Sequence, residues 1–192
     1  MNYADPGYFE RLYQGDADPW GFTTSDYERE KYAATLAVLP RPRFGQGFEV
    51  GCSIGVLTRM LADYCDRLLG VDLSETALGQ ARIRCADLPH VTLERMAIPT
   101  LWPPGPVDLV VLSEVLYYLG TTGIKDAAVR TLDSLTPGGV VVLVNWRGET
   151  GGACTGDRAA DLFMAEAMKR LVVVNQIVTK KYRIDVLAYR RF

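Results

Sequence analysis

The chain has 192 residues, a size that suits one domain with a single buried core. Its 21 Lys and Arg against 23 Asp and Glu give a formal charge of −2, so the composition gives no reason to expect nucleic acid as a partner. Four cysteines without CxxC spacing and a single histidine, His90, predict no zinc site. With no evident secretory signal and no apolar run long enough to span a bilayer, we expect a cytoplasmic protein.

The first 40 residues are predicted to form a helical cap, followed by a sheet-forming core over residues 41–192. A short aromatic helix is expected over residues 8–13 and a longer one over residues 25–39. The second helix should end before Pro40, because proline cannot continue a helix. No repeat or linker divides the chain, so residues 1–192 are expected to form one domain.

Beyond Pro42 the sequence alternates between strand-like and helix-like segments. Strands are predicted at residues 47–50, 67–72, 91–96, 107–113 and 140–146. Helices are predicted at residues 56–64, 75–86, 123–135 and 156–170, with Ser74 as the N-cap of the second. Pro137-Gly138-Gly139 is expected to end the third of these helices and to open the fifth strand.

Two features define the predicted architecture. Continuous apolar strands such as residues 109–112 are buried on both faces, as in a parallel sheet covered by helices. Two β-rich runs, residues 172–179 and 183–189, predict a closing hairpin. The pattern therefore predicts a three-layer α/β/α sandwich.

The turn after the first strand carries the strongest functional signal. The strand passes through Glu49 into a turn with glycines at Gly51 and Gly55, and the next strand ends in a second acid, Asp72. In α/β sheets, this arrangement lets the backbone approach a nucleoside at the strand tips while the second acid meets the ribose hydroxyls.

The spacing of the glycines indicates which nucleoside binds. A dinucleotide loop counted from Gly51 needs glycines where this chain has Ser53 and Val56, so a pyrophosphate site is not predicted. The turn instead resembles motif I of the class I S-adenosylmethionine (SAM) methyltransferases. SAM carries an ammonium and a sulfonium, which suit an acid at Glu49, and its carboxylate can accept backbone N–H groups from the turn.

Further residues are predicted to contact SAM. Leu73 is placed to pack on the adenine ring, and Met96 and Ala97 are candidates for the adenine edge. The full set of predicted cofactor-binding residues is Glu49, Gly51, Cys52, Ser53, Gly55, Asp72, Leu73, Met96, Ala97 and Ser113.

The tip of the fourth strand is predicted to face the methyl-transfer position. There Glu114 and Tyr117 are the candidate catalytic residues, since Glu114 can accept a hydrogen bond from an amine or hydroxyl acceptor. In the alternative interpretation, Glu114 caps the next helix while Tyr117 and Tyr118 pack in the core. Methyl transfer from SAM requires mainly proximity, alignment and dehydration, so no strong catalytic motif is expected.

Aromatic residues are expected to form a wall for the acceptor. Rings beside carboxylates in the N-terminal segment suit a sugar or an amine, whereas for Phe9, Leu12 and Phe22 packing of that segment on the sheet is the preferred interpretation. The candidate substrate-binding residues are Trp20, Tyr27, Tyr118 and Trp146.

Together with Trp20, three stretches resemble the NodS-like methyltransferases: residues 25–32 (SDYEREKY), 49–58 (EVGCSIGVLT) and 113–119 (SEVLYYL). Founding members of that family N-methylate a deacetylated glucosamine at the non-reducing end of chitin-like oligosaccharides. The resemblance implies a Rossmann-like class I methyltransferase sheet with an antiparallel last strand. It also implies SAM as cofactor, S-adenosylhomocysteine (SAH) as product, and an amino-sugar or oligosaccharide acceptor.

One departure from the family pattern keeps other functions open. Where related sequences carry histidines, this chain has Asn145-Trp146-Arg147-Gly148 and Thr155-Gly156-Asp157. The alternatives are an O-methyltransferase of a sugar or secondary metabolite, and a SAM-binding protein without turnover. A nicotinamide oxidoreductase is the weakest alternative, because Ser53 and Val56 replace the glycines that its pyrophosphate would need.

Overall fold

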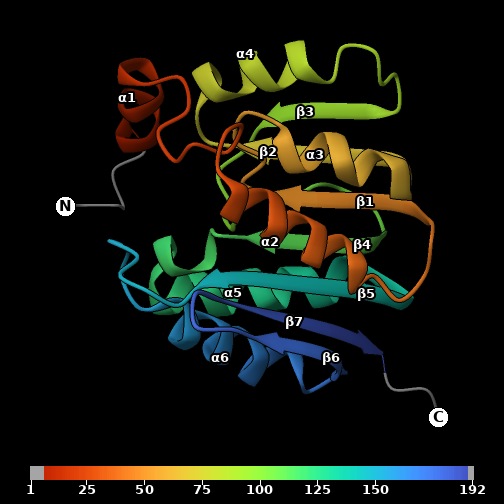
Figure 1. The fold of residues 1–192 in the computed structure, drawn as a ribbon. Helices are drawn as coiled ribbons and strands as arrows, with labels where there is room; N and C mark the ends of the chain where they lie inside the picture. Colours follow the sequence, from red (N-terminus) through yellow and green to blue (C-terminus); the bar gives the residue numbers. More distant parts are fainter. Residues whose placement is uncertain (1–6, 190–192) are drawn as a thin grey trace.

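In the computed structural model, which describes residues 7–189, a seven-stranded sheet lies between two layers of helices (Figure 1). The strands are β1 (Phe44–Val50), β2 (Cys65–Asp72), β3 (Val91–Arg95), β4 (Val107–Ser113), β5 (Leu135–Trp146), β6 (Leu171–Val178) and β7 (Tyr182–Tyr189). Their order is β3-β2-β1-β4-β5-β7-β6, parallel from β3 to β5, with β7 antiparallel to both neighbours. The predicted fold class is confirmed; residues 1–6 and 190–192 of the predicted domain lie outside the described residues.

The helices form two layers on the faces of the sheet, except for one helix that lies apart at the end of the sheet. They are α1 (Gly7–Gly15), α2 (Asp26–Ala37), α3 (Val56–Leu61), α4 (Glu75–Arg84), α5 (Gly120–Ser134) and α6 (Gly156–Ala167), with short 3-10 turns η1 (Ala62–Tyr64) and η2 (Leu116–Tyr118). Helices α2, α3 and α4 cover one face, and α5 and α6 cover the other (Figure 1). Helix α1 lies beside α4, beyond the carboxyl ends of the parallel strands (Figure 1).

Side-chain caps fix where three of the helices begin. Ser25 accepts the Glu28 N–H at the start of α2, and Ser74 accepts the Ala77 N–H at the start of α4. Thr155 caps α6 in the same way. Each cap satisfies an N–H that the first helical turn leaves without a partner, and the prediction of Ser74 as an N-cap is confirmed.

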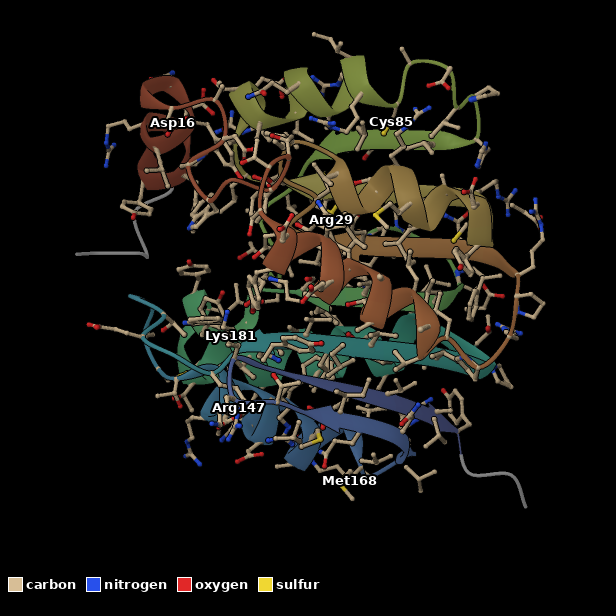
Figure 2. The ribbon with its side chains drawn as sticks, viewed as in Figure 1. Asp16, Arg29, Cys85, Arg147, Met168 and Lys181 are labelled. Carbon is tan, nitrogen blue, oxygen red and sulfur yellow. The ribbon has the colours of Figure 1, made fainter. Side chains whose placement is uncertain are left out.

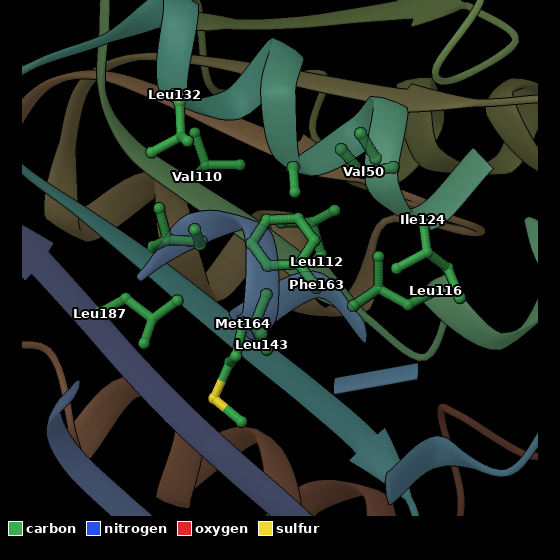
Figure 3. Close-up of a cluster of buried hydrophobic side chains, with 14 of the residues drawn as sticks. Val50, Val110, Leu112, Leu116, Ile124, Leu132, Leu143, Phe163, Met164 and Leu187 are labelled. Carbon is green, nitrogen blue, oxygen red and sulfur yellow. The ribbon is translucent and has the colours of Figure 1, made fainter. Parts of the chain in front are cut away.

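The sheet is buried on both faces. In β4, Val110 and Leu112 pack against α5 and α6, while Leu109 and Val111 point into the layer of α2 and α3. Figure 3 shows the first of these cores, where Phe163 of α6 lies among side chains of β4, β5 and α5. Because the central strands are held by apolar contacts on both sides, their carboxyl ends can carry polar groups at fixed positions.

The start of β5 differs from the prediction. The strand begins at Leu135, opposite Val107, and Pro137-Gly138-Gly139 lies inside it rather than before it. The pairing shifts between Val107 and Leu109, so the Pro-Gly-Gly segment occupies an irregularity in the ladder. The proline and glycines predicted a break between helix and strand. In the structure they instead form a bulge in β5, in its pairing with the parallel strand β4.

The glycine turn after β1 provides a stability test. Gly55 has φ +79°, and a Cβ there would lie 2.9 Å from the Ala81 Cβ of α4. Gly138 has the same φ with nothing within 4 Å of the added Cβ. We expect Gly55→Ala to lower the free energy of unfolding by about 2–4 kcal/mol, and the matched Gly138→Ala to lower it by about 1 kcal/mol. Urea denaturation of both variants measures the difference; equal losses would show that contact with α4 contributes nothing.

Candidate active site

A cavity of about 360 Å³ opens at the carboxyl ends of the parallel strands. It lies between the ends of β1 and β4. From β1 the strands β2 and β3 extend the sheet to one side, and β4 and β5 extend it to the other. In open α/β sheets this is the position at which ligands bind. Helices α1 and α2 supply the wall opposite the sheet, with Tyr13 and Tyr27 among the residues that line it.

The turn that follows β1 forms one side of the cavity. Gly51 has φ +75°, and a Cβ at this position would lie 2.1 Å from a Val115 side-chain carbon, so only glycine fits. The N–H groups of Gly51 and Cys52 both donate to the Val71 carbonyl, at 2.8 and 3.0 Å. Ser53 is also left-handed, with φ 53°, which is uncommon outside glycine and is concentrated at functional sites.

Asp72, at the tip of β2, organises this turn as well as facing the cavity. Its two carboxylate oxygens accept the backbone N–H groups of Ser53 and Ser74, each at 2.9 Å. Burial raises the pKa of Asp72, and these hydrogen bonds oppose the rise. The carboxylate therefore joins the β1 turn to the start of α4, and it still has lone pairs for a ligand hydroxyl.

Helix α1 is fixed over the turn by polar contacts. Glu10 accepts hydrogen bonds from the Ser74 hydroxyl at 2.7 Å and from the Thr76 hydroxyl at 2.5 Å. These bonds lower the pKa of Glu10 to about 2, and the bond from the Thr76 hydroxyl has the largest effect. Tyr13 of the same helix hydrogen-bonds the Ser53 hydroxyl. Helix α1 thus forms part of the cavity wall above the glycine turn.

The predicted cofactor residues divide into two groups. Those that line the cavity are Gly51, Ser53, Asp72, Leu73, Met96 and Ser113. Those that do not line it are Glu49, Cys52, Gly55 and Ala97. Cys52 and Gly55 pack behind the turn against Gly70 and Ala81. At the end of β3, Ile98 lines the cavity and Ala97 does not.

Glu49 is buried in β1 with only 2% of its surface exposed. Its Oε2 atom has no hydrogen-bond partner among residues 7–189. Burial raises the pKa of Glu49 to about 7, and the nearby Asp72 carboxylate adds to the rise. A titratable acid is thus held immediately behind the glycine turn.

Glu114, directly after β4, is the most highly coordinated acid in the cavity. Its backbone is left-handed, with φ 59°. Its Oε1 accepts Lys31 Nζ at 2.7 Å, and its Oε2 accepts both the Tyr117 hydroxyl and the Trp146 N–H at 2.8 Å. Glu114 therefore does not cap the next helix; it points into the cavity and receives donors from three segments.

Lys31 is the cation in this cluster, and the sequence did not identify it as a site residue. Only 2% of its side chain is exposed, and Nζ also lies 2.9 Å from a Glu28 carboxylate oxygen. Glu28 and Lys31 are three residues apart on α2, a spacing that puts them on one helix face and could have indicated the pair. No local pattern of residues indicates that this face is buried.

Tyr117 is 5% exposed, and its ring packs in the core, as in the alternative interpretation of this residue. Its hydroxyl nevertheless reaches the cavity lining and donates to Glu114. Burial raises the pKa of Tyr117 well above its usual range. The phenol therefore remains a hydrogen-bond donor at neutral pH and cannot act as a base.

All four candidate acceptor-binding aromatics, Trp20, Tyr27, Tyr118 and Trp146, line the cavity. Tyr27 packs edge-on against Trp146, with ring centroids 5.4 Å apart. Phe9 and Phe22, for which packing of the N-terminal segment was the preferred interpretation, also line the cavity, and Phe22 packs against two of the core clusters as well. The hydropathy pattern cannot distinguish a ring on a cavity wall from one in a core.

Two basic residues lie near Tyr27 but do not line the cavity. Lys181 Nζ lies 5.1 Å from the centre of the Tyr27 ring, and the Lys181 carbonyl accepts the Arg147 N–H at 2.8 Å. Figure 2 shows Arg147 and Lys181 near each other, at the same end of the sheet as the cavity. Arg147 also pairs with Asp157 at 3.0 Å, and Asp157 does not line the cavity.

The strand order, the glycine turn after β1 and the acid at the tip of β2 define the architecture of a class I SAM-dependent methyltransferase. The family model described as Nodulation protein S (NodS) matches residues 10–182. The chain therefore belongs to the NodS family.

Individual relatives agree with this assignment. Nodulation protein S of Bradyrhizobium diazoefficiens is 36% identical over 119 residues, which are 62% of this chain and 57% of that protein. The chain thus spans less than two thirds of the length of this curated relative. The crystal structure of N-methyltransferase NodS from Bradyrhizobium japonicum WM9 in complex with SAH matches with a TM-score of 0.84 and 24% identity, covering 100% of both chains. A Pseudomonas syringae protein assigned as a methyltransferase matches with a TM-score of 0.73 and 34% identity, covering 84% of this chain and 98% of that one.

Two features are absent from residues 7–189. No helix in this range combines the length and the apolar character needed to cross a bilayer. No group of three or more His, Cys, Asp and Glu side chains in the same range is arranged to hold a metal ion.

The buried acid predicts how stability depends on pH. Because folding raises the pKa of Glu49 from 4.5 to about 7, the folded state binds the proton more tightly, and stability falls as pH rises between these values. Glu49→Gln removes this penalty. We expect the variant to gain up to about 3 kcal/mol over the wild type at pH 8 and almost nothing at pH 4.5. Chemical denaturation at both pH values measures this, with the exposed Glu30→Gln as control; a gain independent of pH would contradict it.

Proposed function

We propose that the protein transfers the methyl group of SAM to the nitrogen of a small or oligosaccharide amine, with an amino sugar as the expected acceptor. The observation that supports this most directly is the Glu114 carboxylate, which lines the cavity and is held by three donors. The NodS protein whose crystal structure matches this fold is described as an N-methyltransferase in complex with SAH, which supports SAM as the cofactor and an amine as the acceptor.

In this proposal the cofactor occupies the side of the cavity formed by β1, β2 and β3. Asp72 accepts the ribose hydroxyls, and Leu73, Met96 and Ile98 contact the adenine ring. The left-handed turn from Gly51 to Ser53 receives the methionine part. Glu49 acts from behind this turn as a negative charge that favours the cations of SAM, and Cys52 and Gly55 support the turn through packing.

The acceptor occupies the side formed by Glu114, Tyr27, Tyr118 and Trp146. The amine must present a free lone pair, so one proton leaves an ammonium and passes to Glu114 or to water. The nitrogen then attacks the sulfonium methyl in line. The C–S bond breaks with its electron pair remaining on sulfur, which yields SAH and a methylated ammonium. In this scheme Tyr117 orients Glu114 and does not itself take a proton.

The other functions have less support. A SAM-binding protein without turnover remains the second candidate, because no histidine lines the cavity among residues 7–189. A carboxylate can perform the same proton transfer, so that observation alone does not favour it. An O-methyltransferase would need to ionise a hydroxyl beside Glu114, where a second negative charge is unfavourable.

The ribose assignment predicts the effect of Asp72→Ala. We expect SAM and SAH affinities, measured by isothermal titration calorimetry, to fall at least tenfold. Because the Ser53 and Ser74 N–H groups also lose their acceptor, the free energy of unfolding should fall by about 1–3 kcal/mol. Asp63→Ala, on an exposed side chain, serves as control. Unchanged affinity for both ligands would exclude Asp72 from the cofactor site.

The acceptor class is tested by SAH release. We expect wild-type protein and SAM to form SAH with chitooligosaccharides that carry one free amine, and not with the fully N-acetylated oligosaccharides of the same length. Binding of SAM without SAH formation from any amine would favour the non-catalytic alternative. Equal turnover of both oligosaccharides would indicate methylation at oxygen.

A further inference from the structure

The acceptor side of the cavity holds a buried charge cluster that the proposed reaction does not by itself explain. Lys31 of α2 lies between two carboxylates, Glu28 on its own helix and Glu114 after β4. The side chains of Lys31 and Glu28 are 2% and 9% exposed, and that of Glu114 is 16% exposed. A buried lysine needs such partners, since an unpaired ammonium out of water is strongly unfavourable.

The hydrogen bonds of Glu114 restrict it to one orientation. Oε2 accepts two donors, the Tyr117 hydroxyl and the Trp146 N–H, and so uses both of its lone pairs. Oε1 accepts Lys31 Nζ alone among the described residues. One acceptor position therefore remains, on Oε1, and Lys31 determines where it lies.

Other charged and titratable groups surround the cluster, and Lys31 is the cation among those in contact with Glu114. Burial raises the pKa values of Tyr27 and Tyr32 of α2, and the charge of the nearby Glu114 adds to both rises. Lys181 Nζ lies 5.1 Å from the centre of the Tyr27 ring. The remaining titratable groups of the acceptor side are Glu28, Tyr117, Tyr118 and Glu149. Acids thus outnumber cations, and without Lys31 they would favour protonation of Glu114.

We infer that Lys31 is a positioning residue that keeps Glu114 ionised and aims its remaining Oε1 lone pair at the acceptor nitrogen. Lys31 does not touch the reacting atoms; it acts through Glu114. The expected effect of Lys31 on the rate of methylation rests on the proposed function. The ionisation of Glu114 does not, because it can be measured without turnover.

The first experiment measures the ionisation of Glu114 directly. The protein is labelled with ¹³C at glutamate carboxyls, saturated with SAH and titrated by NMR from pH 5 to 9, and the Glu114 signal is assigned by its absence in Glu114→Gln. We expect Glu114 to stay ionised in the wild type and in Lys31→Arg. In Lys31→Met, which keeps the chain length but removes the charge, it should take up a proton within this range. An unchanged Glu114 signal in Lys31→Met would overturn the inference.

A second pair of variants tests the inference if Lys31→Met does not fold. The double variant K31M/E28Q removes the cation together with one carboxylate, so it leaves no unpaired second acid in the helix. Compared with E28Q alone, it should still show Glu114 protonating at higher pH. Identical titrations of these two variants would overturn the inference.

Kinetics separate the inference from the proposed function. With an acceptor that the wild type methylates, Lys31→Met should lower kcat at pH 7 by ten- to a hundredfold. Its rate should recover as pH rises, while the KM for SAM stays within twofold. Lys31→Arg should restore most of the rate, and the exposed Lys125→Met should match the wild type. Absence of turnover by the wild type would contradict the proposed function alone, whereas a uniform loss of rate at every pH would contradict the role of Lys31.

Discussion

The carboxylate of Glu114 is the interaction on which the geometry of the site depends. Its donors come from α2, η2 and the end of β5, so one side chain joins the helical segment to the tips of two strands. The left-handed backbone at Glu114 costs on the order of 1–3 kcal/mol. Two hydrogen bonds and a buried ion pair offset that cost only if all three segments are in place. The shape of the acceptor side is therefore coupled to the docking of α2 on the sheet.

Most of the fold could be predicted because its signals are local. Apolar runs such as β4, capping residues such as Ser74, and the glycine turn at Gly51 each determine their own conformation. The parallel sheet then follows, because strands buried on both faces must be covered by helices. The beginning of β5 could not be predicted, since the bulge around Gly138 exists only in pairing with β4.

The candidate site was predictable on its cofactor side and less so on its acceptor side. Asp72 and Gly51 follow directly from strand ends and turn geometry. Lys31 does not, because a lysine in a helix rich in charged residues is expected at the surface, and its partner Glu114 lies 83 residues away. Phe9 and Phe22 show the same limit, since the cavity they line is created by the docking of distant segments.

The charges of the cavity support nitrogen rather than oxygen as the proposed acceptor atom. Methyl transfer to a neutral amine moves a positive charge from sulfur to nitrogen, and the carboxylates of the acceptor side stabilise a cation that forms there. Transfer to an alkoxide creates no such cation, and its ground state would place a second negative charge beside Glu114. When the acceptor proton has passed to water and Glu114 is ionised, Glu28 and Glu114 together exceed the charge of Lys31 by one, so the cluster favours the ammonium product. The buried Glu49 has a corresponding place on the cofactor side. Its negative charge destabilises the folded protein, and it lies next to the proposed position of the cationic cofactor, which that charge favours.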